Sequence, residues 1–221
     1  MEFGFVKDYS QYFINGTIST VVIAVLTVLL GVIIGTLLAL MKISKGRIPR
    51  IIASAYIEFI RGTPLLVQIS LVYYSVSFPK FVFLGIEMNR FIPGVIAMAI
   101  NSGAYVAEII RAGIQAVDKG QMEASRSLGF NGLQSMRYIV LPQAVRNILP
   151  ALGNEFVVVI KESSVLSVIG IVELMRSADI IKAAIYKPFE PLIVVAVIYF
   201  VLTFTLTRVL GFAERRMKTG D

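Results

Sequence analysis

The 221-residue sequence contains no cysteine and no histidine, and only 16% of its residues are charged. The lack of cysteine excludes a disulfide framework and any thiolate metal site. The lack of histidine removes the most frequent general base and metal ligand of enzyme sites. No lysine follows a glycine anywhere in the chain, so the chain has no Walker A loop for nucleotide phosphates. We therefore expect that the chain is not an enzyme and that it holds no metal or cofactor of its own.

Apolar residues, by contrast, make up 57% of the chain. A soluble domain is about 45–50% apolar and about 25% charged, so this composition indicates an integral membrane protein. The formal net charge of +7 would suggest nucleic acid as the partner of a soluble protein. Here the basic residues flank apolar segments, and membrane topology explains them without nucleic acid.

Five apolar segments are long enough to span a membrane, because a helix needs ~20 apolar residues to cross the hydrocarbon layer. The five segments are residues 17–41, 51–78, 91–110, 148–174 and 191–210. The fourth is expected to contain a break or a re-entrant piece near Ser163 and Ser164. Residues 1–13 lack a small-residue cleavage site and are expected to form an interfacial helix rather than a signal peptide.

The positions of lysine and arginine predict the orientation of these segments, because cytoplasmic connections carry an excess of basic residues. The connection after the first segment holds four basic residues and no acidic one, so we place it in the cytoplasm. Alternation then puts residues 79–90 and 176–190 outside, and residues 111–146 and the C-terminal tail inside. The expected structure is one all-α polytopic membrane domain, residues 1–221. It has five transmembrane helices, the N-terminus outside and the C-terminus in the cytoplasm.

The second segment combines an ionisable pair with a helix break. Ionisable side chains inside a span cost roughly 2.5–3.5 kcal/mol each on insertion scales, so they usually face a cavity or a partner. Glu58 and Arg61 are three residues apart and can pair on one helix face, either as a structural ion pair or as a substrate contact. Pro64 has no N–H and disfavours helix at Thr63, so we expect backbone groups near 60–64 to be free to bind a ligand.

The third and fourth segments carry further polar groups. Asn101 and Ser102 form a polar spot next to a glycine, and both substrate contact and tight helix packing through small residues fit this pattern. Glu155 and Glu162 are seven residues apart and share a helix face, so they form an acidic stripe that lacks a cation of its own. Cytoplasmic exposure of one of the two is the alternative.

Two other pairs are expected to be structural. Glu108 lies near the inner end of the third segment, where Arg111 can pair with it one turn later. Gly31 and Gly35 form a GxxxG pattern in the first segment, which favours close helix packing only weakly.

A polar, amphipathic segment, QMEASRSLGFNGLQSMRYIVLP, occupies residues 121–142 and is expected to face the cytoplasm. Gly129 allows the chain to turn, and Pro142 suits the first turn of a following helix. A solvated loop helix and a helix that docks into a cytoplasmic partner both fit these residues.

The spacing within this segment resembles the "EAA" signature of ABC importer permeases. Glu123-Ala124-Ser125 is followed after three residues by Gly129, and after nine more by Ile139-x-Leu141-Pro142, with Ser125 where alanine is usual. In that family the segment is the coupling helix, which seats in a cleft of the ATP-hydrolysing subunit. The resemblance implies a coupling segment at about 118–140. Its coupling residues would be Glu123, Ala124, Ser125, Gly129, Leu141 and Pro142.

Three more stretches resemble the polar amino acid branch of these permeases. They are EFIRGTPLLVQ (58–68), NSGAYVAEIIRAGI (101–114) and NEFVVVIKESSVLSVIGIVEL (154–174). The resemblance implies the type I ABC importer permease fold in a bacterial cytoplasmic membrane. It also implies three kinds of partner: a second permease subunit, identical or different, two ABC ATPase subunits that bind ATP and Mg, and an extracytoplasmic substrate-binding protein.

Charge within the spans favours a cationic amino acid, such as arginine, lysine or histidine, as the substrate. Four acidic residues lie in or near spans against two basic ones, Arg61 and Lys161, so each subunit is short of two positive charges. The acidic residues are Glu58, Glu108, Glu155 and Glu162. Arg61 and backbone N–H groups near Thr63 would take the α-carboxylate. The residues expected to contact the substrate are Glu58, Arg61, Thr63, Asn101, Ser102, Glu155 and Glu162.

Alternatives to this interpretation remain open on the sequence alone. Members of the branch that carry neutral amino acids have similar acidic residues, so the acidic excess can be structural. The binding protein can also set specificity by itself. A different class of function is a stand-alone ion-coupled secondary transporter, with Glu58, Glu155 and Glu162 as cation or proton carriers. Such transporters often contain internal repeats, and none is convincing here.

Overall fold

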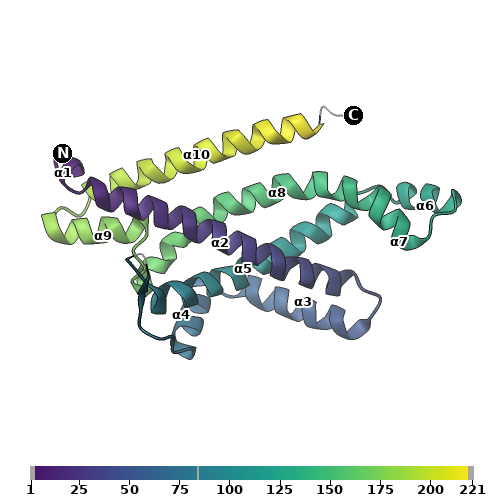
Figure 1. Ribbon diagram of the computed structural model, residues 1–221, viewed down its shortest axis with the longest axis horizontal. Coiled ribbons are helices and arrows are strands. Elements are labelled where there is room, and N and C mark those ends of the chain that lie inside the picture. The colour runs from purple at the N-terminus through teal and green to yellow at the C-terminus, as the bar shows by residue number, and fades with distance from the viewer. Residues whose placement is uncertain (1–2, 84, 219–221) are drawn as a thin grey trace.

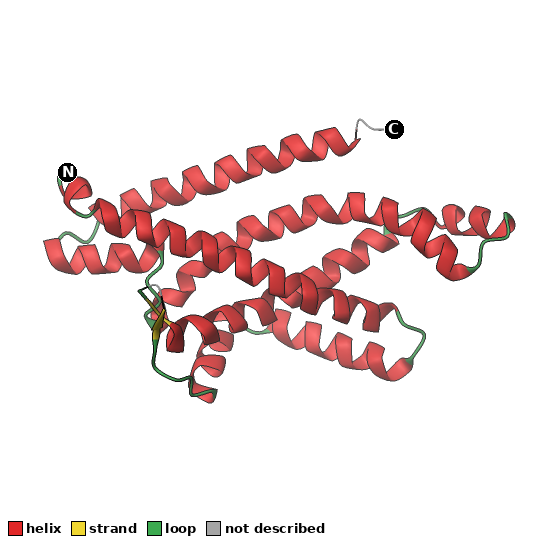
Figure 2. Cartoon of the chain, in the orientation of Figure 1, coloured by secondary structure: helices red, strands yellow, loops and turns green. Residues whose placement is uncertain are grey.

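A computed structural model describes residues 3–83 and 85–218, which are helical almost throughout (Figure 2). Residues 1–2, 84 and 219–221, which include both ends of the expected domain, lie outside the described residues. The long helices are α2 (Ser10–Ile43), α5 (Met88–Gln115), α8 (Leu141–Glu162) and α10 (Glu190–Lys218). They run roughly along the longest axis of the molecule (Figure 1). The predicted all-α fold class is confirmed.

The other elements are short and connect the long helices. They are α1 (Phe5–Asp8), α3 (Arg47–Gly62), α4 (Leu65–Ser75), β1 (Val82–Phe83), β2 (Ile86–Glu87), α6 (Lys119–Ser127), α7 (Gly132–Ser135), the π-helix η1 (Met136–Val140), the 3₁₀-helix η2 (Ser163–Ile169) and α9 (Leu174–Ile185). The two strands pair antiparallel, with Val82 opposite Glu87, and form a small hairpin between α4 and α5.

Three described helices, α2, α5 and α10, are long and apolar enough to cross a membrane. The helices α3 and α4 meet the same criteria as a pair that is bent by 107°. The segment expected to be the fourth span is divided, because α8 ends at Glu162 and the 3₁₀-helix η2 begins at Ser163. The predicted break at this point is confirmed, whereas the number of five spans stays a prediction.

The first long helix begins earlier than the sequence predicted. The structure starts α2 at Ser10 rather than at residue 17, and the expected interfacial helix is reduced to the single turn α1. Packing explains the difference, because Phe13 is buried against Leu174 and Ala178 of α9. An apolar contact of this kind stabilises helix beyond the edge of the most apolar window.

Close contact between α2 and α5 depends on glycine. A Cβ atom added at Gly35 would lie 2.6 Å from Cγ1 of Val106, and one added at Gly31 would lie 3.0 Å from Oγ of Ser102. A side chain at either position would therefore push the helices apart, so the GxxxG pattern is a close-packing motif here. This contact brings α2 directly against the polar spot of α5.

Candidate transport site and coupling segment

Glu155 is a buried carboxylate that the fold places between α8 and α5. The residue is 8% exposed, and its Oε1 accepts a 2.8 Å hydrogen bond from the hydroxyl of Ser102. Within residues 3–83 and 85–218, no lysine or arginine forms an ion pair with Glu155. A buried carboxylate with one hydroxyl donor is poorly compensated for the water it has lost. The site is therefore suited to receive a positively charged group.

Glu162 lies two helical turns after Glu155 on α8 and is partly buried. The two carboxylates share a face of α8, as their spacing predicted. Lys161, which immediately precedes Glu162 in the chain, is exposed. A cation therefore lies next to Glu162 in the chain, whereas Glu155 has no basic partner among the described residues.

The bend between α3 and α4 is stabilised by Gln68, a residue that sequence reasoning missed. The Nε2 of Gln68 donates to the carbonyl of Ile60 at 2.7 Å and to the carbonyl of Thr63 at 3.1 Å. The Oε1 of Gln68 accepts a 2.9 Å hydrogen bond from Nδ2 of Asn101. Carbonyl groups left without a partner by Pro64 are thus occupied by a side chain. The expectation that backbone groups near 60–64 are free for a ligand is therefore wrong for these carbonyls.

Glu58 and Arg61 do not join the buried groups. Both are exposed on α3, and no ion pair connects them among the described residues. The guanidinium of Arg61 lies instead over the ring of Tyr105, 5.3 Å from its centroid. This cation–π contact fixes Arg61 against α5 while its donors stay available to a ligand or a partner subunit.

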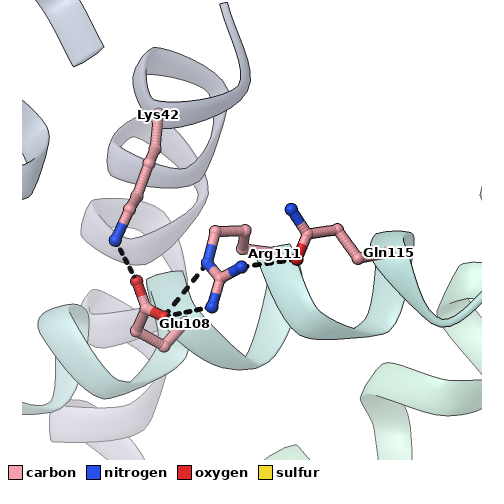
Figure 3. Close-up of polar contacts among 4 residues, drawn as sticks. All are labelled: Lys42, Glu108, Arg111 and Gln115. Atoms are coloured by element: carbon pink, nitrogen blue, oxygen red, sulfur yellow. Dashed lines mark hydrogen bonds and ion pairs between the residues drawn. The ribbon is translucent and has the colours of Figure 1, made fainter.

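Glu108 is a structural residue, as the sequence predicted. Its Oε2 accepts hydrogen bonds from Nε and Nη2 of Arg111 at 3.0 and 2.7 Å, and its Oε1 pairs with Nζ of Lys42 at 2.5 Å (Figure 3). Gln115 accepts from the other guanidinium nitrogen, Nη1. The cluster ties the end of α2 to α5 and neutralises Glu108, so this residue does not contribute to the acidic excess.

Glu173 is a second buried carboxylate, which sequence reasoning also missed. The residue is fully buried and accepts hydrogen bonds from the backbone N–H groups of Met175 and Arg176, both at 2.7 Å. The hydroxyl of Tyr199 on α10 donates to it at 3.0 Å. These donors make Glu173 the N-cap of α9 and a link to α10. Serine, threonine, asparagine and aspartate are the usual caps, so a glutamate within an apolar run gave little signal.

The polar segment forms α6 and α7 and projects at one end of the molecule, together with the connection between α2 and α3 (Figure 1). Asp118 caps α6 through a 2.6 Å bond from the N–H of Gly120. Gly129 has φ +90°, a left-handed conformation that glycine adopts without strain. Leu128 and Leu133 are 81% and 79% exposed, so the tip presents apolar side chains on an otherwise polar surface.

The remaining positions of the EAA-like pattern have local explanations. Ser125 is buried, and its hydroxyl donates to the carbonyl of Met122 at 2.9 Å, so serine fits a place that needs a small side chain. Glu123 and Ala124 are exposed on α6. Pro142 lies in the first turn of α8, as predicted; it and the preceding Leu141 are both exposed.

The geometry can be compared with known proteins. Residues 28–219 match the family described as "Binding-protein-dependent transport system inner membrane component". The chain is 41% identical to a putative glutamine transport system permease protein of Rickettsia conorii, over 96% of both chains. It is 42% identical to an arginine transport system permease protein of Bacillus subtilis, over 95% of this chain and 94% of the relative.

Solved structures agree with this result. A structure described as "Crystal structure of an amino acid ABC transporter with histidines" superimposes with a TM-score of 0.90 at 50% identity, over 98% of this chain and 99% of the other. A MetNI methionine ABC transporter in an inward-facing conformation has a TM-score of 0.67 at 17% identity, over 94% and 95% of the two chains, and shows the shared fold.

The chain therefore belongs to the family of binding-protein-dependent transport system inner membrane components and has the type I ABC importer permease fold. It is a permease subunit of an amino acid ABC importer, and the ATPase of such a system is a separate subunit. The family name implies a bacterial inner membrane, and the fold implies an ATPase, a permease partner and a binding protein. This assignment replaces the ion-coupled secondary transporter as an interpretation.

Proposed function

We propose that this permease carries cationic amino acids and that Glu155 receives their positively charged group. The observation that carries the proposal is the contrast between two buried carboxylates. Glu173 accepts from two backbone N–H groups and a tyrosine hydroxyl, whereas Glu155 accepts from the hydroxyl of Ser102 and has no basic partner in the part of the chain that the structure describes. A guanidinium or ammonium group of the substrate would supply the missing charge.

A revised count of the charged residues in and near the spans also supports a cationic substrate. With the buried Glu173 included, and with Lys42 and Arg111 counted because both pair with Glu108, the balance becomes five acidic residues against four basic ones. The deficit is then one positive charge per subunit rather than two. A substrate with one positively charged side chain matches that deficit.

The other expected contacts are proposed to act in different ways, and only Ser102 contacts Glu155 directly. Glu162 adds negative potential on the same face of α8, and Ser102 orients the carboxylate of Glu155. Arg61, exposed beside Glu58, is suited to bind the α-carboxylate. Thr63 and Asn101 both bond to Gln68, and they are proposed to affect transport by holding the bend between α3 and α4 against α5. The names of relatives support cationic substrates in part, because an arginine permease and a structure with histidines stand beside glutamine permeases.

Direct binding to the permease tests this proposal. The purified complex of permease and ATPase, without the binding protein, should bind arginine at least about tenfold more tightly than glutamine, which corresponds to ~1.4 kcal/mol. Isothermal titration measures both affinities, and omission of the binding protein removes its own selectivity. Equal affinities, or tighter binding of glutamine, would contradict the proposal.

The polar segment is the part of the permease proposed to contact the ATPase. We propose that residues 118–140 seat in a cleft of the ATPase, with Leu128 and Leu133 as apolar contacts. Two ATPase subunits, which hold ATP and Mg, then bind a dimer of permeases, and the extracytoplasmic binding protein delivers the amino acid. The exposed leucines support this, because large apolar side chains on a polar tip indicate a protein contact.

The proposed topology has five crossings, with the N-terminus outside and the C-terminus in the cytoplasm. Figure 1 supports it, since α6, α7 and the connection between α2 and α3 lie toward one end of the molecule, whereas α9 and the start of α2 lie toward the other. The chain has no cysteine, so one introduced cysteine is labelled uniquely. A cysteine at Ser44 should react only from the cytoplasmic side, and one at Lys80 only from outside. Labelling of Ser44 from outside would contradict the topology.

A further inference from the structure

We infer that Gln68 is a positioning residue for transport, because its amide replaces the N–H that Pro64 lacks and joins the α3–α4 bend to Asn101 of α5. By this link the two arms of the bend and α5 move as one body during the transport cycle. The inference is independent of which amino acid is carried.

The bend creates a need for hydrogen bonds inside the membrane protein. A helix that continued through Pro64 would donate its N–H to the carbonyl of Ile60, but proline has no N–H. Water and lipid cannot supply a donor at a buried position within a membrane, so an unpaired carbonyl there is costly. The chain resolves this locally, since Gln68 donates to the carbonyl of Ile60 at 2.7 Å. The hydroxyl of Thr63 lies farther from that carbonyl, at 3.4 Å, and bonds the carbonyl of Phe59 at 3.0 Å.

The orientation of the Gln68 amide is fixed by its partners. The NH₂ group faces three oxygen atoms, which are the carbonyls of Ile60 and Thr63 and the hydroxyl of Thr63 at 3.0 Å. Carbonyls only accept, so the nitrogen must point toward the bend. The oxygen then points to α5, where Nδ2 of Asn101 donates to it at 2.9 Å. One side chain thus satisfies both sides of the junction.

Burial makes this junction rigid. Gln68 and Asn101 are each 5% exposed, and Ile60, whose carbonyl accepts from Gln68, is 6% exposed. Hydrogen bonds excluded from solvent exchange partners at a cost, and the nearest other donor to the Ile60 carbonyl among the described residues is the Thr63 hydroxyl, at the longer distance of 3.4 Å. A rigid junction couples any rotation of α5 to the bend.

A second contact between the same helices provides the competing explanation. The hydroxyl of Tyr56 on α3 donates to the carbonyl of Ile100 at 2.9 Å, next to Asn101. If this bond and apolar packing fix the bend alone, then Gln68 only fills space. The experiment must therefore remove the amide and keep the volume.

The test measures the bend directly in the full complex with ATPase and binding protein. Spin labels on cysteines at Ile51 of α3 and Tyr74 of α4, both exposed, report the distance between the two arms by pulsed electron resonance. In the otherwise wild-type protein this distance should be the same in the nucleotide-free and ATP-trapped states. A straight helix would place the two backbone positions ~35 Å apart, and the bent pair is shorter.

Gln68→Leu should broaden this distance distribution, make it differ between the two states and lower amino acid uptake about tenfold or more. Ser70→Ala is the matched control on α4, because the Ser70 hydroxyl donates to the carbonyl of Leu66 on its own helix, and the substitution should leave the distance and the uptake unchanged. Adding Pro64→Ala to Gln68→Leu returns an N–H to the Ile60 carbonyl. The distance should then shift toward that of a straight helix.

Gln68→Met provides a second apolar variant in case the leucine variant does not assemble. A wild-type distance and wild-type uptake in either variant would overturn the inference. The inference would also be overturned if the distance between the two labels in the wild-type protein changed between the nucleotide-free and ATP-trapped states. Failure of both variants to assemble, even with Pro64→Ala, would show that the Gln68 amide is required for assembly rather than for movement during transport, and would also overturn the inference.

Discussion

Gly129→Asp is expected to abolish transport while the permease remains in the membrane. Gly129 has φ +90°, which L side chains rarely adopt, and, its chain neighbours aside, no described atom lies within 4 Å of an added Cβ. The new side chain therefore strains the turn but meets no described neighbour, and we expect the effect of its charge to arise where the turn meets the ATPase. A carboxylate buried there without a partner costs several kcal/mol in desolvation. The measurement is ATP hydrolysis stimulated by liganded binding protein in the reconstituted complex.

Gly129→Asn is the matched control for this prediction. Asparagine has nearly the shape of aspartate and tolerates positive φ, but it carries no charge. We expect this variant to keep measurable transport and stimulated ATP hydrolysis. Undiminished stimulation in Gly129→Asp would show that residues 118–140 do not dock as proposed.

Glu155→Gln is expected to lower arginine uptake about tenfold or more, equivalent to ~1.4 kcal/mol. The substitution removes the charge with little change in shape, and the amide oxygen can still accept the hydrogen bond from Ser102. The loss would therefore report the charge of Glu155 rather than its packing. Uptake by proteoliposomes that contain the complete importer measures the effect, and assembly with the ATPase should be unchanged.

Glu162→Gln is the natural comparison. Glu162 is less buried and lies beside Lys161, so its charge is partly offset and the expected loss is smaller. Wild-type arginine uptake in both variants would contradict the electrostatic proposal. The same conclusion would follow if the wild-type importer carried only glutamine or glutamate.

The sequence alone determined the class of protein and the places where helices break. The absence of histidine and cysteine, together with long apolar segments, pointed to a membrane protein that is not an enzyme. Local chemistry explains why these predictions hold. Proline at 64 has no N–H for the carbonyl of Ile60, which favours a break there although α8 accommodates Pro150, and glycine at 129 adopts a positive φ more readily than any other residue. The pair Glu108 and Arg111 was also predictable, because residues three apart on a helix are neighbours.

Only the tertiary structure decided which polar groups are satisfied. Gln68 and Glu173 looked like isolated polar residues in apolar runs, and their partners Asn101 and Tyr199 lie 33 and 26 residues away in the sequence. Lys42 is 66 residues from Glu108, so the charge balance could not be counted correctly from the chain. The physical reason is that hydrogen bonds and ion pairs act over a few ångströms in space. Helix packing sets those distances. Gly31 and Gly35, for example, allow the close approach of α2 to α5, and the linear sequence does not state such distances.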